Sequence, residues 1–372
     1  MNILKEIFTN KNFGFFGGGL LPNTDKIIQS RGGYTQLRQL TNDPHLASCI
    51  QSRKSGLLSM DWNIIPNGQS ETVCKTIENI IKNLDIHQLI RNILESVFFG
   101  YQPLEIIWEN SADIIVPKAI KPLPQEWFRF DFSGEFRFTS TGVLENTPIP
   151  ENKLLLPIYE PTSTNPYGSA LLSRCYWPVT FKQAGLRFWV NFMERFGMPL
   201  LIGQYTRGVS QEEAKNLAEE LSNMTEDSVI VTPSDIHIEM KEPMRYSSVD
   251  LYKDLIRLCN DEISKSILSE TLTTEIQTGS YAASQVHYKV RREVVMADKL
   301  LVESVINELI KSIIKLNFKE TVYPRFEIVL MNMDNNELIK RDEILARECG
   351  VRFSKQYLMR RYGFEENEIE CT

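Results

Sequence analysis

The feature that most constrains this fold is a long helical pattern in residues 277–318. A short polar segment containing Gly279 leads into it, and no proline or glycine follows before residue 318. Apolar residues recur three or four positions apart, at Val286, Val290, Val294, Ala297, Leu301, Val305, Leu309 and Ile313. This spacing predicts one face of a helix of roughly thirty residues, about 45 Å long. Such a helix is typical of a core or coiled coil, or of a subunit that lines a passage or bridges neighbours.

The first half of the chain mixes helical and strand patterns. Residues 1–35 are rich in glycine and asparagine and are interpreted as an N-terminal arm. Asp43 followed by Pro44 predicts the start of a helix that ends near residue 56. The remaining predicted elements are a strand at 60–66, helices at 70–84 and 87–98, a strand at 102–108, a hairpin at 127–138 and a strand at 153–158.

The second half begins with a loop rich in proline, glycine and serine at 160–170, and two long helices follow at 171–196 and 248–268. Between them lies a small α/β insert, with strands at 198–205, 228–232 and 235–240. Its helix at 210–222 opens with a capping box formed by Ser210 and Glu213. A strand at 325–330 and a helical segment at 337–361 complete an α+β pattern, and the length of 372 residues suggests two or three domains.

Composition excludes several classes of function. A formal net charge of −7 argues against tight binding of nucleic acid over the whole surface. The six cysteines are scattered and form no CxxC pair, so we expect no disulfide framework, no metal site and no cofactor. We find no catalytic constellation, and the GFFGGG run at residues 14–19 lacks the lysine of a phosphate-binding loop. The N-terminus does not resemble a signal peptide, and no segment is apolar enough for a membrane span.

Basic residues on the two long helices are candidates for contact with DNA phosphates. Lys182 and Arg187 lie on the first helix, and Lys253, Arg257 and Lys265 follow at multiples of four on the second. A solvated helix face with ion pairs at i,i+4 explains most of this pattern equally well. Weak contact of this kind suits a duplex that has to slide.

Several segments together resemble the portal proteins of Mu-like tailed phages. None is a catalytic signature, and the specificity comes from their joint order and spacing. The matching stretches are residues 42–66, 98–108, 165–172, 177–205 and 278–318.

The resemblance implies a portal-type fold assembled as a ring, usually of twelve subunits, at one vertex of an icosahedral head. Carried onto this chain, it implies an arm (1–35), a wing (36–170), stem helices (171–197 and 247–270), a clip (198–246), a tunnel loop (271–284), a long wing helix with a strand (285–335) and a short crown (336–372). The apolar stripes of both stem helices would then be covered by neighbouring copies.

The same resemblance implies a non-enzymatic conduit for double-stranded DNA during packaging and ejection. Its partners would be the terminase large subunit, a head-completion or adaptor protein and the major capsid protein, in the virion and earlier in the host cytoplasm. Besides the basic residues, the tunnel candidates are Thr273, Thr274, Gln277, Thr278 and Ser280. The alternatives are a metal-dependent nucleic-acid enzyme and a non-viral ring-shaped adaptor.

Overall fold

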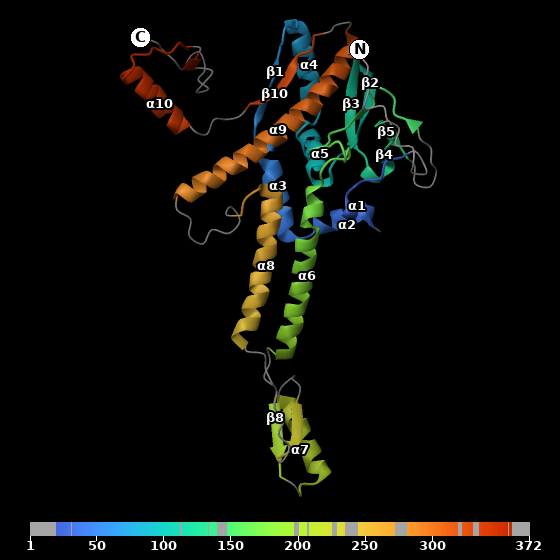
Figure 1. The fold of residues 1–372 in the computed structure, drawn as a ribbon, viewed down its shortest axis with the longest axis vertical. Coiled ribbons are helices and arrows are strands. Elements are labelled where there is room, and N and C mark those ends of the chain that lie inside the picture. Colours follow the sequence, from blue (N-terminus) through green and yellow to red (C-terminus); the bar gives the residue numbers. More distant parts are fainter. Residues whose placement is uncertain are drawn as a thin grey trace, which may run out of the picture.

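The protein consists of a body, a two-helix stem below it and a small unit at the far end of the stem (Figure 1). The computed structural model describes residues 20–30, 32–111, 114–132, 134–139, 147–196, 201–206, 208–224, 229–234, 245–271, 281–318, 322–329, 335–355 and 357–358. The mixture of helices and short sheets confirms the α+β class.

The first part of the body is helical. It contains α1 (Lys26–Gln29), α2 (Gly33–Leu40), α3 (Pro44–Leu58), α4 (Glu71–Asn83) and α5 (Ile86–Phe99). As predicted, Asp43 caps α3, accepting hydrogen bonds from the amides of His45 and Leu46 at 3.1 and 3.0 Å. Gly100, at φ 92°, ends α5 where a side chain would meet the carbonyl oxygen of Tyr167.

Three small antiparallel sheets complete the body. β1 (Asp61–Ile65) pairs with β10 (Arg325–Val329), which joins segments distant in the sequence. β2 (Leu104–Ser111) lies between β3 (Ile114–Pro122) and β7 (Leu154–Leu155), while β4 (Phe128–Phe130), β5 (Phe136–Phe138) and β6 (Thr147–Pro148) form the third sheet after the short 3-10 helix η1 (Gln125–Trp127). The β4–β5 hairpin confirms the prediction from its alternating aromatic residues.

The stem consists of α6 (Leu171–Phe196) and α8 (Arg245–Leu268), which run antiparallel and in contact (Figure 1). At its far end, β8 (Leu201–Tyr205) and β9 (Val229–Pro233) form a parallel pair that α7 (Gln211–Met224) connects. The predicted capping box opens α7, with the Glu213 amide donating to Ser210 Oγ at 3.2 Å and the Ser210 amide to Glu213 Oε2 at 3.0 Å. The predicted strand at 235–240 lies outside the described residues.

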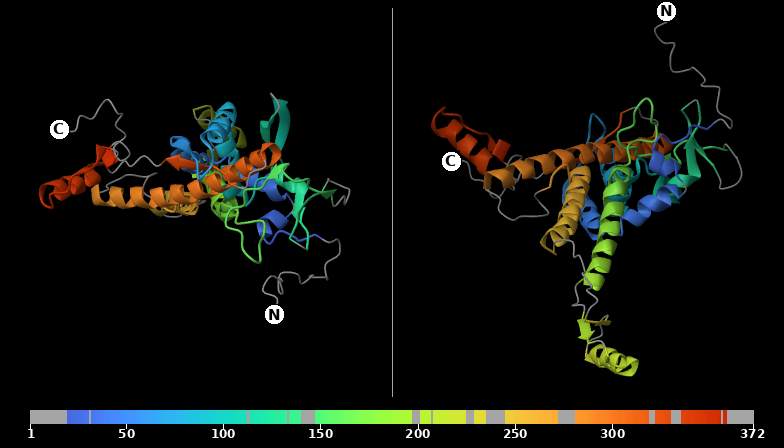
Figure 2. Two further views of the ribbon diagram at one scale, coloured as in Figure 1. Left: turned by 90° about the horizontal axis from the view of Figure 1, so that it is seen from above. Right: turned by 60° about the horizontal axis from the view of Figure 1, so that its bottom comes forward.

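The long helix α9 (Tyr281–Asn317) crosses the top of the body and extends beyond it on the α8 side, as both views in Figure 2 show. Val305, Leu309 and Ile313 of the predicted stripe are buried, together with their neighbours Ile306, Ile310 and Ile314. The buried face of α9 is therefore wider than predicted in the C-terminal half of the helix. Ala297, by contrast, is exposed, so the predicted stripe is interrupted at that residue. α10 (Asn335–Arg347) lies apart from the body (Figure 1).

Three expectations from the sequence need correction. The predicted arm at residues 1–35 contains α1 and the start of α2, because Asp25 caps α1 and Ile28 and Tyr34 pack into the core. The strand β3 was not predicted at all, since its proline and lysine residues conceal the pattern. The helical segment predicted at 337–361 is shorter, because α10 ends at Arg347.

Candidate assembly surface and nucleic-acid interface

The stem helix α6 exposes apolar side chains on both sides of its contact with α8. Gly185 faces α8, since a Cβ there would lie 3.0 Å from Leu255. Because an α-helix turns about 100° per residue, two groups of apolar residues lie on either side of the direction in which Gly185 faces α8. Trp177, Phe181 and Phe188 form what we term the aromatic flank, and Leu186, Val190 and Met193 form the aliphatic flank. All six are between 40% and 62% exposed.

The facing helix α8 extends one of these flanks. Leu251 and Leu258 are 66% and 57% exposed, and their offset from Leu255 puts them on the side of the aromatic flank. Since α6 and α8 are antiparallel and Gly185 meets Leu255, Leu258 is level with Phe181, and Leu251 with Phe188. The stem therefore has one broad apolar side and a second, narrower one opposite.

The predicted apolar stripe of α8 has a different role from the expected one. Cys259, Ile263 and Ile267 are buried within the same chain, so the expectation that neighbouring copies cover the stripe is wrong for these three residues. The physical reason is that the upper half of α8 packs on α3 of the body as well as on α6. The exposed apolar residues of α8 lie on the adjoining face.

The candidate DNA contacts on the stem do not share one face. Lys182 is buried and its ammonium pairs with Asp43 at 2.9 Å, so it has no free side toward DNA. Arg187 is exposed on the edge of α6 that faces away from α8, while Lys253 and Arg257 lie on the outer edge of α8. Lys265 pairs with Glu262 at 2.9 Å and lies about 120° around α8 from Lys253. The row expected on α8 therefore does not share one face, because Lys265 lies away from Lys253 and Arg257, and Arg187 lies on the opposite edge of the stem.

The remaining candidates belong to the predicted tunnel loop. Thr273, Thr274, Gln277, Thr278 and Ser280 lie outside the described residues, between Thr271 and the start of α9 at Tyr281. The structure thus fixes only the two ends of this segment.

Polar side chains of α3 join the upper end of α8 to the body. His45 Nε2 lies 3.0 Å from the carbonyl oxygen of Asn260 and 2.8 Å from Ser264 Oγ. Two turns further on, Arg53 donates to the carbonyl oxygen of Ile267 at 2.7 Å and makes two hydrogen bonds of 2.8 Å to Asp298 of α9. Burial acts to lower the pKa of Arg53, but the hydrogen bonds and charge of Asp298 prevail and raise it.

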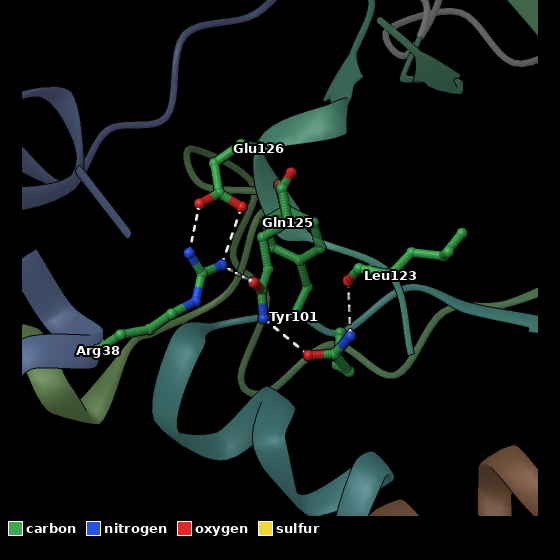
Figure 3. Close-up of polar contacts among 6 residues, drawn as sticks. Arg38, Tyr101, Leu123, Gln125 and Glu126 are labelled. Atoms are coloured by element: carbon green, nitrogen blue, oxygen red, sulfur yellow. Dashed lines mark hydrogen bonds and ion pairs between the residues drawn. The ribbon is translucent and has the colours of Figure 1, made fainter. Parts of the chain in front are cut away.

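A cavity of about 760 Å³ opens at the root of α6, between α2, α3, α5 and the segment that follows β3. A chain of polar contacts forms one wall (Figure 3). Arg38 pairs with both carboxylate oxygens of Glu126 and donates to Gln125 Oε1 at 2.8 Å. Gln125 donates to Gln102 Oε1 at 2.7 Å, and Gln102 donates to the carbonyl oxygen of Leu123 at 2.9 Å. No motif in the sequence indicated this wall, because its members lie far apart along the chain.

The described part of the chain contains no cluster of three or more histidine, cysteine or acidic side chains arranged to hold a metal ion. Cys49, Cys74, Cys175 and Cys259 are free and buried, and Cys349 is free and exposed. Burial raises the pKa of the Cys175 thiol to about 12, which makes it a poor nucleophile. Within the same ranges, no helix combines the length and apolar character needed to cross a bilayer.

Comparison with solved structures identifies the fold. One chain in the virion of a native gene transfer agent particle superimposes with a TM-score of 0.62 at 10% identity, covering 92% of this chain and 96% of that one. A chain in the neck of an empty gene transfer agent particle gives a TM-score of 0.60 at 11% identity, covering 90% and 94%. The protein therefore shares the fold of these two chains.

Sequence comparison places the chain more narrowly. The family described as the portal protein of Mu bacteriophage matches residues 34–364. This protein therefore belongs to that family. A Mu-like prophage protein gp29 of Haemophilus influenzae is 22% identical over 85% of this chain and 63% of its own length. The portal protein of Escherichia phage Mu is 25% identical over 75% and 56%. The chain thus spans roughly three fifths of the length of these curated relatives.

Proposed function

We propose that this chain is a portal subunit that assembles into a closed ring, of twelve copies, at one vertex of a phage-like capsid. The observation that carries the proposal is the pair of apolar flanks on opposite sides of the stem. A two-fold dimer needs a single self-complementary face, whereas a ring needs two different faces that meet head to tail. The side of the stem that carries the aromatic flank in one copy would meet the side that carries the aliphatic flank in the next.

The function that follows is a conduit for double-stranded DNA during packaging and ejection, without catalysis of its own. The portal family and the fold support this role. The small unit of β8, β9 and α7 (198–246) would be the clip that docks the terminase large subunit and a head-completion or adaptor protein. The body would be the wing that contacts the major capsid protein, and α10 would belong to a short crown. The ring would form in the host cytoplasm and remain in the virion.

The direct test is the mass and shape of the purified full-length protein. We expect native mass spectrometry and negative-stain imaging to show rings of about twelve copies. A monomer that persists across protein concentrations and salt concentrations would contradict the proposal.

Contact with DNA is tested by separating the two basic edges of the stem. Only one edge can face a central channel, because Arg187 and the pair Lys253 and Arg257 point in opposite directions. Arg187→Glu is therefore the matched control for the double variant Lys253→Glu with Arg257→Glu. We expect rings from both proteins, and impaired DNA packaging from only one. If both variants package DNA normally, neither edge contributes contacts to the conduit.

The tunnel loop is tested by deleting residues 273–280, which removes all five of its candidate residues. We expect rings to form normally and DNA packaging or retention to fall. Loss of the rings would instead assign this segment to the interface between subunits.

A further inference from the structure

Two aromatic side chains project together from the upper part of α6. Trp177 and Phe181 stack with their ring centroids 5.5 Å apart and an angle of 27° between their planes. Each is more than half exposed, and both lie in the first half of α6, the helix that contacts α2 and α5 of the body. An exposed pair of large stacked rings is a typical anchor for a protein interface.

The cavity at the root of α6 lies on the other side of the same helix. Leu172 lines it, and five residues separate Leu172 from Trp177, which corresponds to about 140° around the helix. Phe181 lies about 180° from Leu172 by the same measure. The aromatic pair and the cavity thus lie on opposite sides of α6.

Trp177 also lies near the height of the cavity along the stem. It is five residues, about 7.5 Å, from Leu172 along the axis of α6, and Phe181 is nine residues, about 13.5 Å, from Leu172. In a closed ring, the same residue lies at the same height along the ring axis in every copy. A side chain that projects from one side of a subunit therefore meets the surface of the next subunit at the same height. A projection and a hollow on opposite sides of one helix are the two halves of such a contact.

The lining of the cavity matches aromatic rings in size and chemistry. Ile50 and Leu58 of α3 and Phe98 and Phe99 of α5 contribute apolar surface, and Lys54 lies with its ammonium 5.2 Å from the Phe98 ring centroid. Exposed Arg91 adds a second cation at the rim. Cavities of about 300–1,000 Å³ enclose drug-sized molecules, so about 760 Å³ accommodates two aromatic side chains. Lys54 also pairs with Glu95, another lining residue, so Arg91 is the cation best placed to favour an aromatic face over an aliphatic one.

We propose that Trp177 and Phe181 of each subunit insert into the cavity at the root of α6 in the adjacent copy of the same chain. This inference rests on the proposed ring and names the contact that anchors it. The occupant is a second copy rather than another protein because the chain itself carries both complementary halves, placed for head-to-tail repetition. The fixed polar wall of Arg38, Gln125 and Gln102 keeps the cavity preformed, which lowers the entropic cost of docking.

A photo-crosslinking experiment tests the contact in the full-length protein. A benzophenone amino acid replaces Trp177, and native mass spectrometry first establishes whether rings form. After irradiation, we expect crosslinks between chains that map to residues 47–58 or 91–99. The same probe at Phe188 is the matched control and should map to the aliphatic flank around Val190. Rings whose Trp177 crosslinks map elsewhere would overturn this inference alone, whereas absence of rings from the unmodified protein would overturn the proposed function.

Substitution provides an independent measurement. We expect the double variant Trp177→Ala with Phe181→Ala to raise the protein concentration at which half of the subunits are in rings about tenfold or more. Its thermal unfolding as a monomer should match that of the parent, since both side chains are largely exposed there. Leu300→Ala is the control, because Leu300 is 60% exposed on α9, away from the stem. An unchanged ring midpoint in the double variant would contradict the inference.

Discussion

The root of the stem and its free length use the same two helices in opposite ways. Near the body, the apolar side chains of α6 and α8, including Val179, Ile263 and Ile267, are covered by the chain itself. Further down, Phe188, Val190 and Leu251 are exposed although the two helices remain in contact. The polar groups differ as well, since the root holds buried ion pairs and the free stem carries exposed ones such as Lys253 with Asp250.

This difference shows which part of the molecule is complete as a single chain. The body and the body-facing side of the root bury their apolar side chains and pair their buried charges, so they can be stable alone, whereas Trp177 and Phe181 remain exposed on the opposite side of the root. The free stem leaves large apolar side chains in water on two sides, which is unusual for a monomer. Substitutions should therefore act on folding at buried positions of the root, and on assembly at exposed apolar positions of the free stem and at Trp177 and Phe181.

The largest effect is expected where the root depends on a buried charge pair. Arg53→Met leaves Asp298 buried without its partner and also removes the donor to the Ile267 carbonyl. Breaking one half of such a pair costs about 3–5 kcal/mol of unfolding free energy. Urea unfolding of the monomeric protein measures it, and Lys75→Met is the control because its pair with Glu71 is exposed. Equal stability of the two variants would mean that the root does not depend on the pair.

The next prediction compares two positions five residues apart on α8. Ile263→Ala opens a cavity at a fully buried site and should cost about 2–5 kcal/mol. Leu258→Ala removes a side chain that is 57% exposed and should cost about 0.5 kcal/mol or less in the monomer. We expect the reverse order in ring assembly, with the Leu258 variant impaired among correctly folded chains. Calorimetry and native mass spectrometry give the two readouts, and similar folding losses at both positions would remove the distinction.

The sequence predicted the elements of the stem better than their surroundings. The helix at 171–196 matches α6 and the capping box at Ser210 matches the start of α7, because both depend on local spacing and local hydrogen bonds. Which surface packs against the apolar stripe of α8 could not be predicted in the same way. Periodicity identifies an apolar face but does not say whether the same chain or another copy covers it.

The site was less accessible to sequence reasoning than the fold. From its spacing, Lys182 is predicted to lie on a solvated helix face. In the structure it is buried and forms an ion pair with Asp43, the residue that caps α3. The cavity wall joins Arg38 to Gln125 and Glu126, and no local pattern links positions so distant in the sequence. The aromatic pair Trp177 and Phe181 has helical spacing typical of a core, so its exposure became evident only from the structure.

A smaller effect is expected at the start of α3, where Asp43 both caps the helix and pairs with Lys182. Asp43→Asn retains a capping side chain but leaves the Lys182 ammonium buried without a counter-charge, at a cost of about 1–3 kcal/mol. Lys182→Met should cost less, because the Asp43 carboxylate keeps its two backbone donors. Chemical denaturation of both variants checks the order. A larger loss from Lys182→Met would show that the pair, rather than the cap, fixes the carboxylate.

The smallest effect is expected at the half-exposed pair that Arg38 of the cavity wall makes with Glu126. Burial acts to raise the pKa of Glu126, but the hydrogen bonds and charge of Arg38 prevail and lower it. A lowered pKa in the folded state contributes stability above the unfolded value of about 4.3, and this stability is lost as the pH falls through the folded pKa. We therefore expect Glu126→Gln to cost less than about 1 kcal/mol at pH 7, since solvent screens the pair.

The pH profile separates this charge effect from simple packing. Urea unfolding of the parent and of Glu126→Gln should differ at pH 7, and their unfolding free energies should converge as the pH falls below about 4, where the carboxylate gains its proton. Glu71→Gln is the control, because Glu71 is exposed and pairs with Lys75 on the surface of α4. A difference that persists unchanged at low pH would assign the loss to hydrogen-bond geometry in the wall. The cavity would then be held open by shape alone, and its charge would not contribute to the stability of the root.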